Sequence, residues 1–279
     1  MKIITNELIE QFENYLICEE KSSATLEKYI RDITVFMQWL NGREVDKSAV
    51  MEYKQILIGK YAPLSTNSMI SSLNSFFDYA EWFECKVKTL KIQRQIYINK
   101  DKELTKAEYL RLLKAARQQK NEKLYMLMQT ICSTGIRVSE IKFITAEAVK
   151  HGQARINCKG KMRVVILPQQ LCRMLIRYMK QQGILCGPVF VSKNGKSLDR
   201  SNIWRLMKNL CETAGVSREK VFPHNLRHLF ARTYYSLEKD VVRLADILGH
   251  TSVNTTRIYT MGTGEEHRKQ IQRLGLLLC

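Results

Sequence analysis

Apolar side chains recur every three or four positions through most of the chain, which is the spacing of helices with one buried face. In the first 85 residues Ser22-Ser23 precedes one such run and Asn41-Gly42 ends it, as caps do. The spacing predicts helices at about residues 6–19, 22–41, 46–59 and 63–83. Helices of this length with short connections form a compact bundle, so we expect a four-helix N-terminal module.

The rest of the chain is also mainly helical, with one contrasting segment. Residues 153–167 alternate around a Lys159-Gly160 turn and are rich in valine and isoleucine, which predicts a β-hairpin. A short strand and turn are expected at residues 189–196. Thr105 and Glu108 have the spacing of a capping box and mark a sharp helix start. Further helices are expected at about residues 122–133, 169–182, 201–214, from 223, and 241–248. The predicted fold is mostly α with a small β-hairpin.

The distribution of charge changes near residue 85, where the predicted N-terminal bundle ends. The formal net charge is +18, yet residues 1–85 carry eight Lys/Arg against thirteen Asp/Glu. The positive excess begins with residues 86–102, which hold six basic residues and lack a helical period. We therefore predict a helical domain at 1–85, a basic linker at 86–102 and a second, α+β domain at 103–279. Such a basic second part favours a polyanionic partner, nucleic acid before an acidic membrane.

Several classes of protein are disfavoured. No run of eighteen apolar residues is present and the N-terminus lacks an apolar signal core, so we expect neither a membrane span nor secretion. The eight cysteines are scattered without a C-x-x-C pair, which fits a reducing cytoplasm. Neither a phosphate-binding glycine loop, an H-E-x-x-H motif nor an acidic cluster is found. We expect no cofactor and no metal.

Residues 223–259 hold the most informative side chains. If Pro223 opens a helix, His224 and Arg227 share one face near its N-terminus, where anions are favoured. An imidazole and a guanidinium aimed at one point can hold a phosphate group. Gly249-His250 ends the next helical run, and Tyr259 follows a Thr/Ser/Asn-rich stretch. Each feature alone has an ordinary structural interpretation; together, in this order, they are distinctive.

HNLRHLFA followed by LGHTSVNTTRIYT resembles the C-terminal signature of the tyrosine recombinases, or phage integrase family. Thr134–Glu140 is similar to the TGxRxSE turn of that family, so the resemblance makes Arg137 the first active-site arginine, positioned by Glu140. The family hairpin carries a lysine beside the leaving oxygen, and Lys159 matches it best, with Lys161 as an alternative. Residues 1–85 are similar to the SAM-like core-binding module of the family.

The resemblance implies a mechanism without metal or ATP. Tyr259 would attack phosphorus, giving a 3′-phosphotyrosyl link and a free 5′-hydroxyl. Lys159 would protonate the leaving oxygen. The phosphate would be held by two arginines and two histidines: Arg137, Arg227, His224 and His250.

The implied partner is double-stranded DNA with a specific recombination site. Contacts are expected from the fourth helix of the first module and from the hairpin, at Thr66, Asn67, Ser71, Lys161 and Arg163. Family members often pack the C-terminal tail into a neighbouring subunit. We therefore expect a homotetramer on DNA, held through the apolar helix at residues 265–278.

Two alternatives share these features. A type IB topoisomerase has similar chemistry without strand exchange, but the short chain and its layout favour an Xer-like recombinase or a small mobile-element integrase. A DNA-binding regulator or an inactive recombinase would bind DNA without forming a covalent adduct. Against this alternative, every catalytic position is filled.

Overall fold

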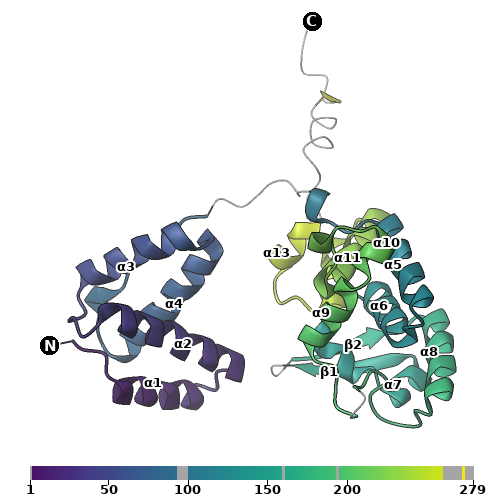
Figure 1. Cartoon of the computed structure of the whole chain (residues 1–279), viewed down its shortest axis with the longest axis horizontal. Helices are drawn as coiled ribbons and strands as arrows, with labels where there is room; N and C mark the ends of the chain where they lie inside the picture. Colours follow the sequence, from purple (N-terminus) through teal and green to yellow (C-terminus); the bar gives the residue numbers. More distant parts are fainter. Residues whose placement is uncertain (1, 93–99, 159–160, 193–194, 260–271, 274–279) are drawn as a thin grey trace, which may run out of the picture. The chain divides into compact units, whose positions relative to one another are not determined.

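The computed structural model of the chain describes residues 2–92, 100–158, 161–192, 195–259 and 272–273 (Figure 1). The chain divides into two compact units, Met1–Arg94 and Gln95–Cys279. Each unit has its own hydrophobic core. Within the described residues, no helix is both long and apolar enough to cross a membrane.

The first unit is a helical bundle, as predicted. Its described part contains α1 (Asn6–Cys18), α2 (Ser23–Leu40), α3 (Lys47–Lys60), α4 (Pro63–Tyr79) and the short 3-10 helix η1 (Phe83–Cys85). Asn41 ends α2 in the left-handed conformation, with φ of 49°. The fourth helix stops at Tyr79, earlier than the sequence pattern suggested, and a turn at Ala80 and Glu81 leads to η1.

Aromatic side chains fill the core of the first unit. Phe12, Phe36, Phe76 and Phe77 are fully buried. The rings of Phe12 on α1 and Phe76 on α4 meet edge to face, with centroids 5.3 Å apart. Fully burying such side chains stabilises the bundle by about 1.5–3 kcal/mol each.

Residues 86–91 are held against α4 by two asparagines. Nδ2 of Asn74 donates to the carbonyl of Val87 at 2.9 Å, and the Val87 N–H donates back to Oδ1 at 3.1 Å. Asn67 makes the same pair of bonds with Leu90, at 2.9 and 2.7 Å. Asn67 and Asn74 lie two helical turns apart, on one face. The segment that we expected to begin the linker is therefore fixed to the first unit up to about Leu90.

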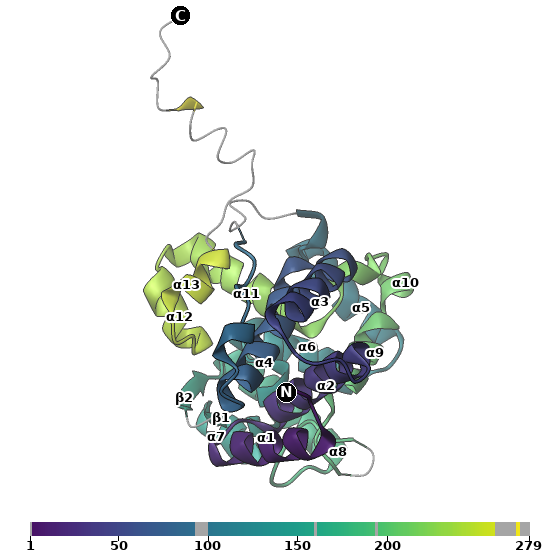
Figure 2. The same ribbon diagram turned by 90° about the vertical axis from the view of Figure 1, so that its left-hand side faces the viewer.

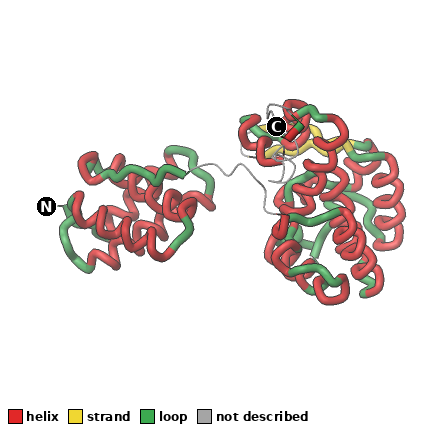
Figure 3. Tube along the Cα trace, turned by 90° about the horizontal axis from the view of Figure 1, so that it is seen from above, coloured by secondary structure: helices red, strands yellow, loops and turns green. Residues whose placement is uncertain are grey.

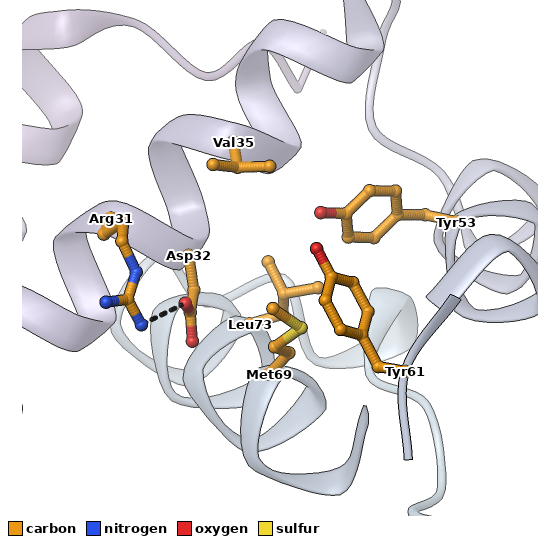
Figure 4. A pocket seen from close by; sticks show the side chains of 7 residues that line it. All are labelled: Arg31, Asp32, Val35, Tyr53, Tyr61, Met69 and Leu73. Carbon is orange, nitrogen blue, oxygen red and sulfur yellow. Dashed lines mark hydrogen bonds and ion pairs between the residues drawn. The ribbon is translucent and has the colours of Figure 1, made fainter. Parts of the chain in front are cut away.

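A small pocket of about 180 Å³ lies between α2, α3 and α4 (Figure 4). Asp32 lies at its wall, only 5% exposed, where it accepts from Lys28 at 2.7 Å and Ser72 at 2.9 Å and pairs with Arg31. Burial raises the pKa of Tyr53, on the opposite wall, to about 12. Lys28, a basic residue on the second helix, is thus engaged inside the bundle.

The second unit is mostly helical with one small sheet, also as predicted (Figure 3). Strands β1 (Gln153–Cys158) and β2 (Lys161–Ile166) pair antiparallel, with Gln153 opposite Ile166. The α-helices are α5 (Lys106–Gln118), α6 (Glu122–Thr134), α7 (Ala146–His151), α8 (Gln169–Gln182), α9 (Arg200–Lys208), α10 (Cys211–Ala214), α11 (Pro223–Glu238), α12 (Val241–Leu248) and α13 (Val253–Thr256). The 3-10 helices are η2 (Lys100–Lys102), η3 (Val138–Phe143), η4 (Arg218–Lys220) and η5 (Arg257–Tyr259).

Two elements of the second unit differ from the prediction. The helix expected at 201–214 is broken into α9 and α10. The strand expected near residue 189 is reduced to isolated bridges, Thr145 with Pro188 and Val191 with Ser197. The side chains of Val189 and Phe190 are fully buried in the core, which accounts for the apolar run. The Val189 N–H donates to the carbonyl of Ile144. A short apolar run alone does not distinguish a regular strand from a buried segment without one.

Helix α6 lies at the centre of the second core and is buried on nearly all sides, from Leu124 to Ile131. It packs against α5, α8, α9 and α11. Helix α12 lies beside α11, and α13 lies beside α12 (Figure 2). This arrangement brings the end of α6, the start of α11 and the end of α12 together.

Candidate active site

Arg227 lies where these three helices meet. Its side chain is on the first turns of α11, which begins at Pro223, and only 1% of the residue is exposed. The guanidinium donates to the carbonyl of Gly135 at 2.6 Å and to that of Leu248 at 2.7 Å. Its Nη2 also lies 3.0 Å from Nε2 of His250. Burial, followed by the charge of Arg137, lowers the pKa of Arg227 to about 10, so it remains charged at neutral pH.

A glycine turn delivers the second arginine. Gly135 ends α6 with φ of +64°, and an added Cβ would lie 2.5 Å from Cδ1 of Phe230. Only glycine fits both conditions without displacing the aromatic ring. Arg137 follows, with about 40% of its side chain exposed, and donates to Glu140 at 2.9 Å and to the Gly249 carbonyl at 3.3 Å.

Glu140 is a buried acid that orders the arginines around it. Its carboxylate accepts from the backbone and side chain of Arg137, each at 2.9 Å, and from Nη2 of Arg163 at 2.6 Å. Burial alone would raise the pKa of Glu140, but these hydrogen bonds and the charge of Arg163 lower it overall. The carboxylate is therefore ionised at neutral pH, and it positions Arg137 as the resemblance implied.

Two histidines complete the cluster as neutral groups. Burial, followed by neighbouring positive charge from His228 and the arginines, lowers the pKa of His224 to about 4. Burial and the charges of Arg227 and Arg137 lower the pKa of His250 to about 4 as well. Nδ1 of His250 lies 2.8 Å from Oγ1 of Thr256. At neutral pH both imidazoles are therefore uncharged.

Tyr259 closes the site from η5. It is 4% exposed, and its ring lies nearly parallel to that of His250, with centroids 6.1 Å apart. Burial raises the pKa of Tyr259 overall, while the charge of Arg227, a hydrogen bond from that residue and the charge of Arg137 act in the opposite direction. The structure thus brings together five of the six predicted catalytic residues: Arg137, His224, Arg227, His250 and Tyr259.

A cavity of about 710 Å³ opens onto this cluster, lined by Arg137, His224 and Arg227. Arg200 and Trp204 of α9, neither of which was predicted from the sequence, form another part of its wall. Their signal was weak, since one arginine and one tryptophan on a helix are ordinary. The surplus of guanidinium groups suits a phosphate group.

The predicted lysine lies outside the described residues. Lys159 belongs to the hairpin turn at 159–160, and the side chain of Lys161 is also outside the described part. The assignment of a general acid to Lys159 or Lys161 therefore stays a prediction. The same holds for the tail helix expected at 265–278, apart from the two described positions 272 and 273.

Among the predicted DNA contacts, Thr66 is contradicted by the structure. It is fully buried, and its hydroxyl donates to the carbonyl of Leu57 at 3.2 Å. Asn67 is occupied by its bonds to Leu90. Ser71 is exposed on α4, its hydroxyl donating to the carbonyl of Asn67 at 2.8 Å. A helix face predicted from polarity alone can thus be an internal one.

Arg163 is contradicted in the same way. We expected it to reach DNA from the hairpin, but only 14% of its side chain is exposed. Its guanidinium donates to Glu140 and to the carbonyl of Ile247, so it joins β2 to α12. Arg163 is therefore a structural support for Glu140 and, through it, for Arg137.

Comparisons with known proteins agree with this arrangement. Residues 102–266 match the Phage integrase family and residues 9–84 match the Phage integrase, N-terminal SAM-like domain. The chain is 27% identical to Tyrosine recombinase XerA of Pyrococcus furiosus, covering 99% of this chain and 96% of that protein. It is 26% identical to Tyrosine recombinase XerD of Vibrio cholerae, covering 91% of each.

Solved structures show the same fold. The crystal structure of XerA recombinase aligns with a TM-score of 0.54 at 25% identity, covering 99% of this chain and 100% of that one. A lambda integrase tetramer bound to a Holliday junction aligns with a TM-score of 0.73 at 18% identity, covering 91% and 76%. The chain therefore belongs to the phage integrase family, the tyrosine recombinases, and is a site-specific DNA recombinase.

Proposed function

We propose that this recombinase cleaves DNA with Tyr259 as the nucleophile. The phenolic oxygen attacks phosphorus, the bond from phosphorus to the 5′ oxygen breaks, and a 3′-phosphotyrosyl link forms. Arg137 and Arg227 stabilise the charge on the non-bridging oxygens. Attack by the 5′-hydroxyl of another strand then reverses the step and releases the tyrosine. Because the phosphoester bond is conserved in the link, the cycle needs neither ATP nor a metal.

Two proton transfers accompany this step: the phenol of Tyr259 loses a proton, and the leaving 5′ oxygen gains one. His224 and His250 are unprotonated at neutral pH because their pKa values are about 4. The lone pair of His250 faces Arg227, so His224 is the imidazole that accepts the tyrosine proton or a hydrogen bond from it. Lys159, or Lys161 in its place, gives a proton to the leaving 5′ oxygen. The reverse reaction moves the same protons back.

The observation that carries the proposal is the meeting of five side chains from four segments, three of which, Arg137, His224 and Arg227, line the cavity. They come from the turn after α6, the start of α11, the end of α12 and η5. Arg227 lies 3.0 Å from Nε2 of His250, and its charge acts to lower the pKa of Tyr259. Within the described residues Glu140 is the carboxylate that pairs directly with the arginines of the site. Its oxygens already accept hydrogen bonds from Arg137 and Arg163.

We also propose a division of labour between the domains. Residues 1–85, with the segment fixed to them up to about Leu90, bind the core of the recombination site. The rest of the predicted 86–102 segment forms a basic linker, and residues 103–279 hold the catalytic site. Exposed neutral donors such as Ser71 suit phosphate contacts in a module that carries a negative net charge. Most of the electrostatic affinity then comes from the linker and catalytic domain.

On DNA we propose a tetramer, as in the lambda integrase structure, with the tail after Tyr259 packed into a neighbouring subunit. The apolar end at Leu274, Leu276, Leu277 and Leu278 supports this, because it needs a cover. The protein would act in the cytoplasm, on chromosomal or mobile-element DNA.

The test is covalent trapping. The full chain is mixed with nicked DNA fragments from the ends and flanks of its own genetic element, and SDS-resistant, protease-sensitive adducts are collected. Tyr259→Phe should abolish the adduct, whereas Tyr234→Phe, a matched control on α11, should not. An adduct that persists in Tyr259→Phe would refute the assignment. Strand exchange between two trapped sites then separates a recombinase from a relaxing topoisomerase.

A further inference from the structure

Glu103 is a largely buried acid just before the start of α5, and its carboxylate faces His228 and Arg232 of α11. Its Oε2 lies 3.0 Å from Nη2 of Arg232, and its Oε1 lies 3.6 Å from Nδ1 of His228. Only 14% of the Glu103 side chain is exposed. Burial would raise the pKa of Glu103, but the hydrogen bond and charge of His228 and the charge of Arg232 lower it overall. A buried, ionised carboxylate is costly to keep, and apolar packing would stabilise this position at least as well.

The backbone on both sides of Glu103 is held by the same face of α11. Nδ2 of Asn225 donates to the carbonyl of Lys102 at 2.8 Å, and Nη2 of Arg232 donates to that of Leu104 at 2.7 Å. Positions 225, 228 and 232 lie on one side of a helix. The chain therefore enters the catalytic unit along this face, with Glu103 aimed at His228.

His228 in turn lies against the proposed nucleophile. Its ring meets that of Tyr259 edge to face, with centroids 4.9 Å apart and an interplanar angle of 89°. The ring of His228 also meets that of His224, with centroids 4.4 Å apart. Its Nε2 is buried without a hydrogen-bond partner in the described part of the structure, and its Nδ1 faces Oε1 of Glu103.

We propose that Glu103 and His228 are positioning residues for Tyr259: Glu103 fixes the imidazole of His228, and that ring holds the tyrosine in line for attack. This inference rests on the proposed role of Tyr259. Tyr259 has His250 along one face and His228 perpendicular to it, so removing the anchor of His228 frees one of the two rings that confine the nucleophile. Small displacements of a reacting group cost a large part of the rate.

The experiment measures single-turnover adduct formation on the nicked substrate at saturating protein, together with DNA affinity and melting temperature. Glu103→Gln should slow adduct formation about tenfold or more, while Kd changes less than about twofold. The matched control is Glu108→Gln, which removes another partly buried acid, bonded to Thr105 and Lys220, but does not touch His228. Glu108→Gln should alter melting without slowing the chemical step.

His228→Phe keeps an aromatic ring but loses the nitrogen that faces Glu103, so it should be slowed like Glu103→Gln. The double variant should be no slower than His228→Phe alone, because both changes remove one interaction. Glu103→Asp keeps the charge and should recover part of the rate, which also serves if Glu103→Gln folds poorly. A merely structural role would give no such recovery.

The outcomes separate the two proposals. If Tyr259→Phe abolishes the adduct but Glu103→Gln and His228→Phe react at the wild-type rate, the positioning role is refuted and the nucleophile stands. Additive losses in the double variant would refute it too, as would a loss of rate matched by an equal loss of binding. If Tyr259→Phe still forms the adduct, the nucleophile assignment itself fails.

Discussion

Nη2 of Arg227 lies 3.0 Å from Nε2 of His250, and this pair joins the start of α11 to the end of α12. Arginine only donates hydrogen bonds, so Nε2 must accept, and the proton of the neutral imidazole belongs on Nδ1, facing Thr256 at 2.8 Å. The tautomer of His250 is thereby set by its two neighbours. The same guanidinium also holds the carbonyls of Gly135 and Leu248.

The first prediction concerns that guanidinium. Arg227→Lys should lower the rate of adduct formation by about 10²–10³-fold, because a single ammonium cannot hold two carbonyls, orient His250 and stabilise the phosphate together. Arg205→Lys, on the exposed part of α9, is the control and should react normally. A small effect of Arg227→Lys in single-turnover kinetics would contradict the role given to the several hydrogen bonds of the guanidinium.

A second prediction follows from the burial of Arg163. Arg163→Ala should slow cleavage by releasing Glu140 and Arg137, but the dependence of DNA affinity on salt should stay unchanged. An arginine that contacted a phosphate would instead reduce the salt slope by about one when removed. Arg155→Ala, an exposed arginine on β1, is the matched control in the same hairpin. Binding titrations between low and high salt measure both slopes.

The third prediction compares two glycines that end helices. Gly249 and Gly215 both have positive φ, +65° and +59°, so alanine strains each backbone by roughly 1–2 kcal/mol. At Gly249 an added Cβ would lie 2.4 Å from Cδ of Arg163, whereas nothing lies within 4 Å at Gly215. Gly249→Ala should therefore lose more free energy of unfolding, and it alone should slow cleavage. Equal losses in urea unfolding would show that Arg163 moves aside freely.

The fourth prediction is a pH dependence of stability without DNA. The pKa values of His224 and His250 are about 4, below the usual 6.5, so the unfolded chain binds protons in this range and the folded chain does not. Stability from these two groups should be complete above pH 6.5 and fall as the pH drops towards 4. Melting temperatures at pH 7.5 and 5 should show the loss, and His224→Asn with His250→Gln should make it smaller. An unchanged slope in that variant would contradict the assignment.

The fifth prediction concerns the two asparagines of α4. Asn67→Ala and Asn74→Ala should speed amide hydrogen exchange at Leu90 and Val87 respectively by about tenfold, because each loses a pair of hydrogen bonds worth roughly 1.4 kcal/mol. Ser71→Ala, on the same helix, should leave both amides protected. If exchange were equally slow in all three variants, the segment would be held by other contacts.

Local features of the structure were predictable. Periodicity and caps located the helices, and the capping box of Thr105 with Glu108 is confirmed. The alternating segment is the hairpin β1–β2, and Pro223 does begin α11. These signals are local because helix and turn geometry depends on residues three or four positions apart. The order of chemical groups from His224 to Tyr259 also indicated the family, which the comparisons confirm.

Most of the helices, the hairpin, the family and the residue types of the site could therefore be predicted from the sequence alone. Tertiary structure decided which polar side chains face inward. Arg163 and Thr66 have the composition of surface contacts, yet each bonds to a carbonyl from another element. Glu103 gave no signal at all, because its partner His228 lies 125 positions away. Burial and pairing across such separations arise when helices pack, and no local pattern in the chain encodes them.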